Sequence, residues 1–225
     1  MTPAVGPLVA RGRDAEVFDH GPGLVLRRYR GPRDTVREAA VMQLAGAHGV
    51  PVPAVHEVTA TDMVMERVDG PTLLDWAIPS PRRLRRAARI LAELHRAVAA
   101  VPAPGWLPAP LGEGSSLAHG DLHPLNVMMT ARGPVLIDWT NGCRAPAEAE
   151  VALTWIIMAT SEIPGPLPVR LVAGAVRGRF VRQFLSHFDL DPVRAALPRV
   201  AELRLADQNV TDRERERVRA LVARE

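Results

Sequence analysis

Lysine is absent from this sequence: all 28 residues of its Lys and Arg total are arginines. Cysteine is nearly absent, because Cys143 stands alone and no disulfide can form within the chain, as is usual in a reducing compartment. No apolar run reaches the roughly 18 residues that a membrane-spanning helix requires. The first residues also lack the basic and then apolar pattern of a secretory leader. We therefore expect a cytoplasmic protein that does not associate with membranes.

Neither sign of charge is in large excess. The 28 arginines face 25 acidic residues, which leaves a formal net charge of only +3. No basic stretch is interleaved with aromatic residues, the pattern of proteins that bind single-stranded nucleic acid by stacking. We interpret the densest basic run, Arg82 to Arg89, as the solvated face of a helix. We expect no nucleic-acid partner, and the oligomeric state stays open.

The first 68 residues have the pattern of short strands separated by turns. We expect a helix after Asp34, an N-cap residue, which continues to about Ala47. Pro51 and Pro53 then require an extended chain, because the residue before a proline is disfavoured in the helical region. One helix among strands predicts a small α+β lobe over residues 1–68. The expected strands cover residues 8–10, 16–18, 24–27, 54–58 and 63–68.

The remaining residues, 69–225, are predicted to form a mainly helical lobe. One helix begins at Ser80 and Pro81, since proline is favoured at the first helical position, and its apolar residues recur at helical spacing. The tail has three more helical patterns, and the last opens with Thr211 and Glu214 in the arrangement of a capping box. These patterns cover residues 167–188, 192–206 and 211–224.

The strongest motif occupies residues 119–139. It reads His-Gly-Asp-Leu-His-Pro-Leu-Asn from His119 to Asn126 and, after a predicted β-hairpin around residues 130–134, Ile-Asp-Trp. Phosphoryl transfer requires a carboxylate near the attacking hydroxyl and oxygen ligands that hold Mg²⁺ against the ATP phosphates. Asp121 can supply the first carboxylate, and Asn126 and Asp138 can supply metal ligands. The hairpin would bring Asn126 and Asp138 side by side.

Each of these side chains alone has a simpler explanation. Asp and Asn in loops commonly form turns, and an isolated histidine is commonly structural. The joint spacing and the flanking strands favour a functional site. We expect His119 to be structural and to orient the loop through hydrogen bonds, whereas His123 can have either role.

On these residues the segment resembles the catalytic loop of the aminoglycoside phosphotransferase and choline kinase family, whose motif is His-Gly-Asp-Leu-His-Pro-x-Asn followed by Ile-Asp-Trp. The resemblance implies a two-lobed, protein-kinase-like α+β fold. It implies an enzyme that transfers the γ-phosphate of ATP, with Mg²⁺, to a hydroxyl of a small molecule. Asp121 would be the catalytic base, and Asn126 and Asp138 would bind Mg²⁺. The alternative is a nucleotide-binding pseudokinase that regulates or scaffolds.

The same resemblance extends to the small lobe. Residues 65–70 are similar to the family's hinge, in which the Glu66 carbonyl and the Val68 N–H would hold the adenine. Arg27 stands where the family has a strand cation that touches the phosphates, and Glu38 stands where its helix carboxylate sits. Arg28 is the alternative, although strand alternation would turn it to the opposite face. Surface arginine is the simpler reading of both.

Three positions depart from the family pattern. The turn at residues 11–15 has a single glycine, Leu125 replaces a usually small residue, and Glu148 and Glu150 stand where many relatives have an Asp. The acceptor is not identified by the sequence. Residues 164–225 contain no acidic cluster for a polycationic aminoglycoside, which favours another small hydroxylated acceptor.

Overall fold

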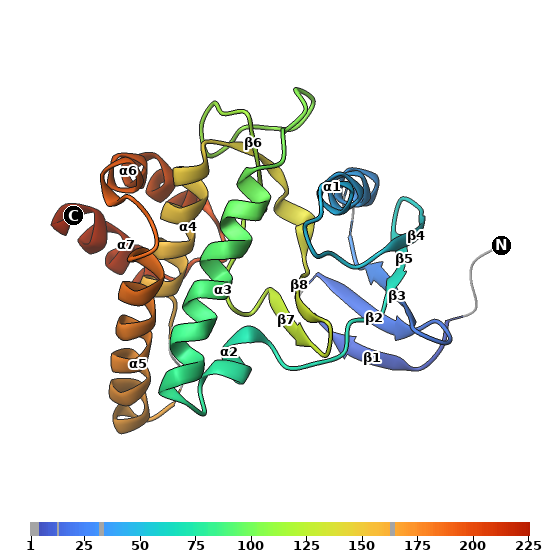
Figure 1. Cartoon of the computed structure of the whole chain (residues 1–225), viewed down its shortest axis with the longest axis horizontal. Helices are drawn as coiled ribbons and strands as arrows, with labels where there is room; N and C mark the ends of the chain where they lie inside the picture. Colours follow the sequence, from blue (N-terminus) through green and yellow to red (C-terminus); the bar gives the residue numbers. More distant parts are fainter. Residues whose placement is uncertain (1–4, 13, 32–33, 163–164) are drawn as a thin grey trace.

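The computed structural model describes residues 5–12, 14–31, 34–162 and 165–225, and it has two lobes (Figure 1). The N-terminal lobe is an antiparallel five-stranded sheet with strand order β1-β2-β3-β5-β4. Arg13, within the predicted turn, lies outside the described residues. The strands are β1 (Leu8–Arg11), β2 (Ala15–Asp19), β3 (Leu24–Tyr29), β4 (Val55–Val58) and β5 (Asp62–Glu66).

Helix α1 (Thr35–Ala47) packs against β4 and β5. It begins as predicted, because the Asp34 side chain accepts a hydrogen bond from Arg37 N at 2.9 Å. The extended segment after it reaches the other lobe, where Leu136 N donates to Pro51 O at 2.8 Å. The two prolines therefore keep the chain extended where it runs from α1 to β4 and touches the other lobe.

The C-terminal lobe consists mainly of helices (Figure 1). Two short antiparallel strand pairs lie beside them: the hairpin of β7 (Val127–Thr130) and β8 (Gly133–Leu136), and the pair of β6 (Ser116–Ala118) with β9 (Cys143–Ala145). The hairpin was predicted, and the β6–β9 pair was not. The helices are α2 (Leu73–Ala77), α3 (Pro81–Ala99), α4 (Ala147–Thr160), α5 (Leu167–Leu185), α6 (Leu190–Ala206) and α7 (Asp212–Arg224), with a 3₁₀ turn, η1 (Trp139–Asn141).

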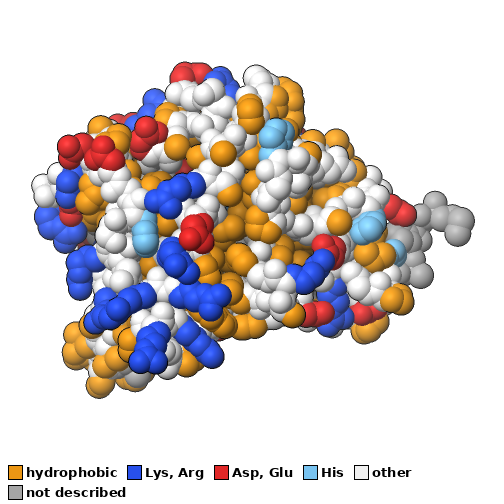
Figure 2. Space-filling view, in the orientation of Figure 1, with side chains coloured by type: hydrophobic (Ala, Val, Ile, Leu, Met, Phe, Trp, Pro, Cys, Tyr) orange, Lys and Arg blue, Asp and Glu red, His pale blue; other side chains and the backbone are white. Residues whose placement is uncertain are grey.

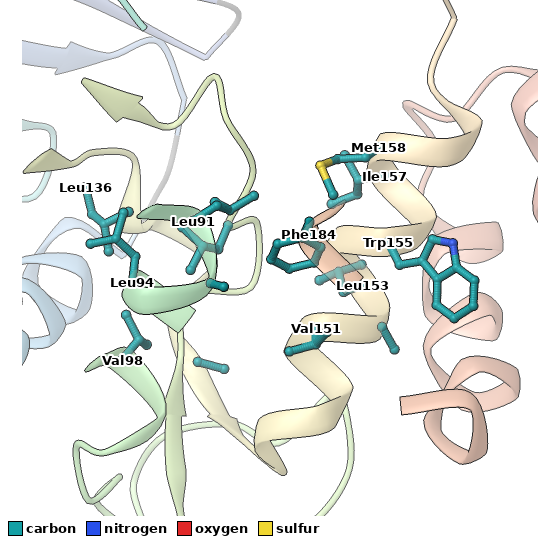
Figure 3. Close-up of a cluster of buried hydrophobic side chains, with 14 of the residues drawn as sticks. Leu91, Leu94, Val98, Leu136, Val151, Leu153, Trp155, Ile157, Met158 and Phe184 are labelled. Atoms are coloured by element: carbon teal, nitrogen blue, oxygen red, sulfur yellow. The ribbon is translucent and has the colours of Figure 1, made fainter. Parts of the chain in front are cut away.

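Helix α4 forms the centre of this lobe and is buried on almost every side. It packs against α3, α5, α6 and α7. Figure 3 shows its apolar side chains facing those of α3 and α5, among them Leu153 with Leu91 and Phe184. A helix that is apolar all round is typical of a core position. Its central place fixes the loops at its N-terminal end, where the candidate site lies.

None of the helices in the described part of the chain is long and apolar enough to cross a membrane.

Candidate active site

The motif at residues 119–126 forms a loop between β6 and β7, and its Asp121 and Asn126 are joined by hydrogen bonds. Asn126 Nδ2 donates to the Asp121 carbonyl at 2.8 Å and to Asp121 Oδ2 at 3.1 Å. Ile137 N donates to Asn126 O at 3.0 Å across the hairpin, so Asn126 and Asp138 lie side by side, as the sequence predicts. Asp121 and Asp138 both line one cleft between the lobes.

Asp138 has a strained backbone. Its φ of 65° is in the left-handed region, the one positive φ of a non-glycine residue in the described chain. Thr140 Oγ1 donates to its carboxylate at 3.0 Å. Such strain is common where function fixes a side chain, and here it aims the carboxylate into the cleft.

Arg27 connects the two lobes through two carboxylates. Its guanidinium donates to Glu38 Oε1 at 3.0 Å in the N-terminal lobe and to Asp138 Oδ1 at 2.7 Å in the C-terminal lobe. Burial alone would lower the pKa of Arg27, but the carboxylates of Glu38 and Asp138 outweigh burial and raise it. The same ion pair lowers the pKa of Asp138 against the effect of its own burial. Tyr29 holds the other Glu38 oxygen, Oε2.

Arg28 points to the other face of the sheet. It forms two hydrogen bonds with Asp62, at 2.9 and 2.7 Å, and it does not line the cleft. The side-chain alternation of a strand therefore separates the two arginines as expected.

Glu150, at the start of α4, fixes the loop that contains Asp121. Its carboxylate accepts hydrogen bonds from His119 N at 2.5 Å and from Gly120 N at 2.7 Å. Burial raises the pKa of Glu150 to about 7, although these donors act in the opposite direction. The sequence showed Glu150 only as a departure from the family pattern. The structure shows that it holds the backbone beside the candidate base, a role that no local pattern signals.

Two buried histidines support the same loop. His119 Nε2 lies 3.0 Å from Ile137 O, and its ring lies 4.5 Å from that of Trp139, which agrees with the expected structural role. His95 of α3 lies 2.9 Å from Thr154 Oγ1, and Thr154 donates to Leu122 O at 2.6 Å. Burial lowers the pKa of both histidines, that of His95 to about 3. His123 lies beside the candidate base, with Nε2 3.4 Å from Asp121 Oδ1.

The cleft has a volume of about 960 Å³ and is bordered by both lobes. Glu66 and Val68 line it at the connection between the lobes. The Glu66 side chain pairs with Arg132, which fixes this connection on the C-terminal lobe. Val68 N donates to no other described residue, so this N–H is available to a ligand in the cleft.

The side-chain oxygens of Asn126 and Asp138 fit the ligand preference of Mg²⁺ bound together with a nucleotide. Amide and carboxylate oxygens are the hard ligands that Mg²⁺ prefers, and it commonly takes its other ligands from phosphates and water. No group of three or more His, Cys, Asp or Glu side chains that could hold a metal occurs among the described residues.

Solved structures share this architecture. That of a thermostable mutant of aminoglycoside phosphotransferase APH(4)-Ia, apo form, matches over 98% of this chain and 95% of its own, with a TM-score of 0.69 and 18% identity. A choline/ethanolamine kinase family protein from Mesorhizobium loti matches over 97% and 86%, with a TM-score of 0.56 and 17% identity. Identities this low show the fold alone, which is the two-lobed, protein-kinase-like fold.

Curated proteins match over shorter segments. A probable bifunctional tRNA threonylcarbamoyladenosine biosynthesis protein from Methanoculleus marisnigri is 30% identical over 58% of this chain and 23% of its own length. A probable serine/threonine-protein kinase BUD32 homolog from Archaeoglobus fulgidus is 29% identical over 48% of this chain and 45% of its own. The chain thus spans less than half the length of these relatives. A model of the phosphotransferase enzyme family, in contrast, matches residues 7–118 and 106–203, which together make up most of the chain. The chain belongs to the phosphotransferase enzyme family.

Proposed function

We propose that this chain transfers the γ-phosphoryl group of ATP to a hydroxyl of a small molecule. The observation that supports this most directly is that Asp121, Asp138 and Arg27 line one cleft, while Asn126 holds the Asp121 carboxylate by a hydrogen bond. Solved relatives of the same fold were crystallised with ADP and with AMP-PNP, each together with hygromycin B. Phosphoryl transfer depends on positioning and on charge stabilisation, and this cleft offers groups for both.

Asp121 is the proposed base. Its carboxylate accepts the proton of the acceptor hydroxyl as the new O–P bond forms and the bond from the γ-phosphorus to the bridging oxygen of ADP breaks. Asn126 holds Asp121 through its Nδ2 and would present its Oδ1 to Mg²⁺ beside Asp138. When bound, Mg²⁺ would neutralise the charge that accumulates on the phosphate oxygens.

Arg27 is the proposed phosphate-binding cation. In the structure its guanidinium contacts Asp138, the same carboxylate that would bind Mg²⁺. Binding of Mg·ATP therefore requires Arg27 to exchange Asp138 for phosphate oxygens, while Glu38 continues to hold its other side. A guanidinium presents parallel donors to phosphate, so the missing lysine is replaced by a bidentate contact.

Part of the cleft lining comes from the C-terminal helices. The end of α6 and the turn after it contribute Leu203, Asp207 and Asn209, and Leu153 and Ile157 of α4 line the cleft as well. Solved structures of the same fold hold the small molecule hygromycin B, which supports a small acceptor in place of an extended peptide.

The charges that line the cleft do not suit a polycation. Asp207 lines the cleft here, but its carboxylate accepts hydrogen bonds from Asn209 N at 2.8 Å, Asn209 Nδ2 at 2.9 Å and Arg204 Nη1 at 3.1 Å. It is thus engaged within the protein. Of the other carboxylates that line the cleft, Glu66, Asp69 and Asp138 are paired with arginines, so we propose an acceptor with little positive charge.

The test is a transfer assay with γ-labelled ATP, in which hydroxylated metabolites, aminoglycosides and a serine-containing protein substrate compete as acceptors. We expect label on a small neutral alcohol, and we expect Asp121→Asn to lower turnover about 10²–10⁴-fold. Near-wild-type turnover by this variant would exclude Asp121 as the base. Preferential labelling of the protein would instead favour the activity named for the Archaeoglobus relative. Mg·ATP binding without any transfer would favour a nucleotide-binding regulatory protein.

A further inference from the structure

Three strongly exposed apolar side chains lie together at the start of α5. Leu167, Leu171 and Val172 are 65%, 66% and 67% exposed, more than any other large apolar side chain described. Their spacing places them on one helical face, which Pro168 and Ala175 share. Monomeric soluble proteins rarely leave such a cluster uncovered, and where it occurs it commonly marks a binding surface.

Exposed arginines surround this cluster. Within the described chain only Arg89 of the α3 arginines has a carboxylate partner, Glu93 at 3.6 Å. Arg83 and Arg86 lie over the ring of Trp76, at 5.4 and 5.7 Å from its centroid. The exposed face of α5 itself continues with Arg179 and Arg182. The exposed arginines in the first half of α3 are Arg82, Arg83, Arg85, Arg86 and Arg89.

The apolar cluster of α5 and the arginines of α3 lie at the same level of the C-terminal lobe. Helices α3 and α5 pack together and run in the same direction (Figure 1). His95 of α3 contacts Phe184 of α5, with ring centroids 5.0 Å apart. Counting back equally along both helices from this contact places Leu171 level with Arg82, because the rise per residue is the same in each. Figure 2 shows the arginines gathered over these helices, with apolar side chains at their lower end.

We propose that this α3–α5 tip, made of Leu167, Leu171 and Val172 with the five arginines of α3, docks on an anionic membrane surface. Aliphatic side chains enter the boundary between headgroups and acyl chains, while arginines contact anionic headgroups. A nucleic acid would use the arginines but gain nothing from the aliphatic side chains. A second copy of the chain would bring like charges together. From the sequence we expected a solvated face for this basic run and no association with membranes; the exposed apolar cluster beside it leads us to revise both expectations.

Docking at the tip would leave the cleft accessible, since no tip residue lines it. The proposal is therefore independent of the proposed catalytic function.

The experiment is co-sedimentation of the full chain with vesicles of phosphatidylcholine alone or mixed with phosphatidylglycerol. We expect binding to the mixed vesicles only, weakening as salt is added. Arg82→Glu with Arg85→Glu should lower the affinity at least about tenfold, since each arginine near an anionic surface contributes roughly fivefold. Leu171→Asp should weaken binding as well. Two control variants should bind the vesicles within about twofold of wild type. Arg199→Glu with Arg219→Glu makes the same change of charge elsewhere on the surface. Val36→Asp places the same new charge on the exposed face of α1.

The proposal would be overturned if the wild type did not sediment with the mixed vesicles. It would also be overturned if the tip variants and the control variants lost the same amount of vesicle binding. A dimer in light scattering that Leu171→Asp dissociates would assign the apolar cluster to self-association. Binding of a tRNA probe that the arginine variant loses and Leu171→Asp keeps, without vesicle binding, would assign the arginines to nucleic acid.

Discussion

Arg27 illustrates how one side chain can be shared between structure and proposed chemistry. It is held by Glu38 and Asp138, and its guanidinium also lies 4.8 Å from the ring centroid of Tyr29. The pKa of Arg27 is raised because its carboxylate partners outweigh its burial, so it stays charged at every working pH. A lysine would have one compact charge and could not reach two carboxylates in this forked way.

We predict that Arg27→Ala lowers kcat/KM for ATP about 10- to 100-fold, because it removes one or two charge-assisted hydrogen bonds to phosphate. Arg27→Lys should recover only part of this loss. Arg28→Ala is the matched control. It breaks the pair with the buried Asp62 and should lower thermal stability while leaving kcat/KM nearly unchanged. Steady-state kinetics and thermal denaturation of the three variants provide both readouts. The reverse ranking in kinetics would show that Arg28 faces the nucleotide.

Substitution of Asp138 should affect the binding of Mg·ATP and of metal-free ATP differently. We predict that Asp138→Ala weakens binding of Mg·ATP far more than binding of ATP without metal, because the lost oxygens would have bound Mg²⁺. Metal-free ATP should even gain, since Arg27 is released from its ion pair with Asp138. Calorimetric titrations with and without Mg²⁺ measure both. Equal losses in the two titrations would remove Asp138 from the metal site.

At the scale of elements, the amphipathic and capped segments were predictable, and the buried helix was not. Helices α1, α3 and α7 have an N-cap, an N-terminal proline or a capping box at their starts and lie where the sequence placed them. Helix α4 is apolar on all faces, so it has no helical periodicity to detect. Its Glu150 therefore seemed a mere departure from a family pattern. The β6–β9 pair was also not predicted, because three-residue strands that pair across 24 intervening residues have no local sequence pattern.

The contact between α4 and the loop of residues 119–126 predicts a pH effect on stability. The pKa of Glu150 is raised from 4.5 to about 7, so between these values the folded chain binds more protons than the unfolded chain. The contribution of Glu150 to the free energy of unfolding therefore falls as pH rises across this interval. We predict that the wild type loses on the order of 3 kcal/mol between pH 5 and pH 8 relative to Glu150→Gln.

Urea denaturation at the two pH values measures this difference, and Glu148→Gln, in the first turn of the same helix, serves as control. Glu150→Gln should also lower turnover, because an amide has one accepting oxygen for the two N–H groups of His119 and Gly120. Parallel stability profiles for wild type and Glu150→Gln would mean that Glu150 stays ionised throughout.

At the scale of the whole molecule, the two lobes share one hydrophobic core. Buried residues of α1, including Val41 and Met42, belong to the same cluster as those of α3 and α4. The packing is close where the lobes meet, since a Cβ added at Gly142 would lie 2.7 Å from Val41 Cγ1. The predicted boundary between residues 68 and 69 thus describes a change of architecture in the sequence, while the packing argues that the lobes unfold together.

Tryptophan fluorescence can test whether the lobes share one core, because all four tryptophans lie in the C-terminal lobe and report on its unfolding alone. We predict that Met42→Ala, in the N-terminal lobe, destabilises the chain by about 2–5 kcal/mol, the usual cost of removing a buried Met side chain. It should shift the urea midpoint seen by tryptophan fluorescence as much as that seen by far-UV circular dichroism, in one transition. Val36→Ala, on the exposed face of the same helix, should leave both midpoints within about 0.5 kcal/mol of wild type. A fluorescence midpoint unmoved by Met42→Ala would mean that the lobes unfold separately, and that Arg27 and Asp138 meet across an interface that opens on its own.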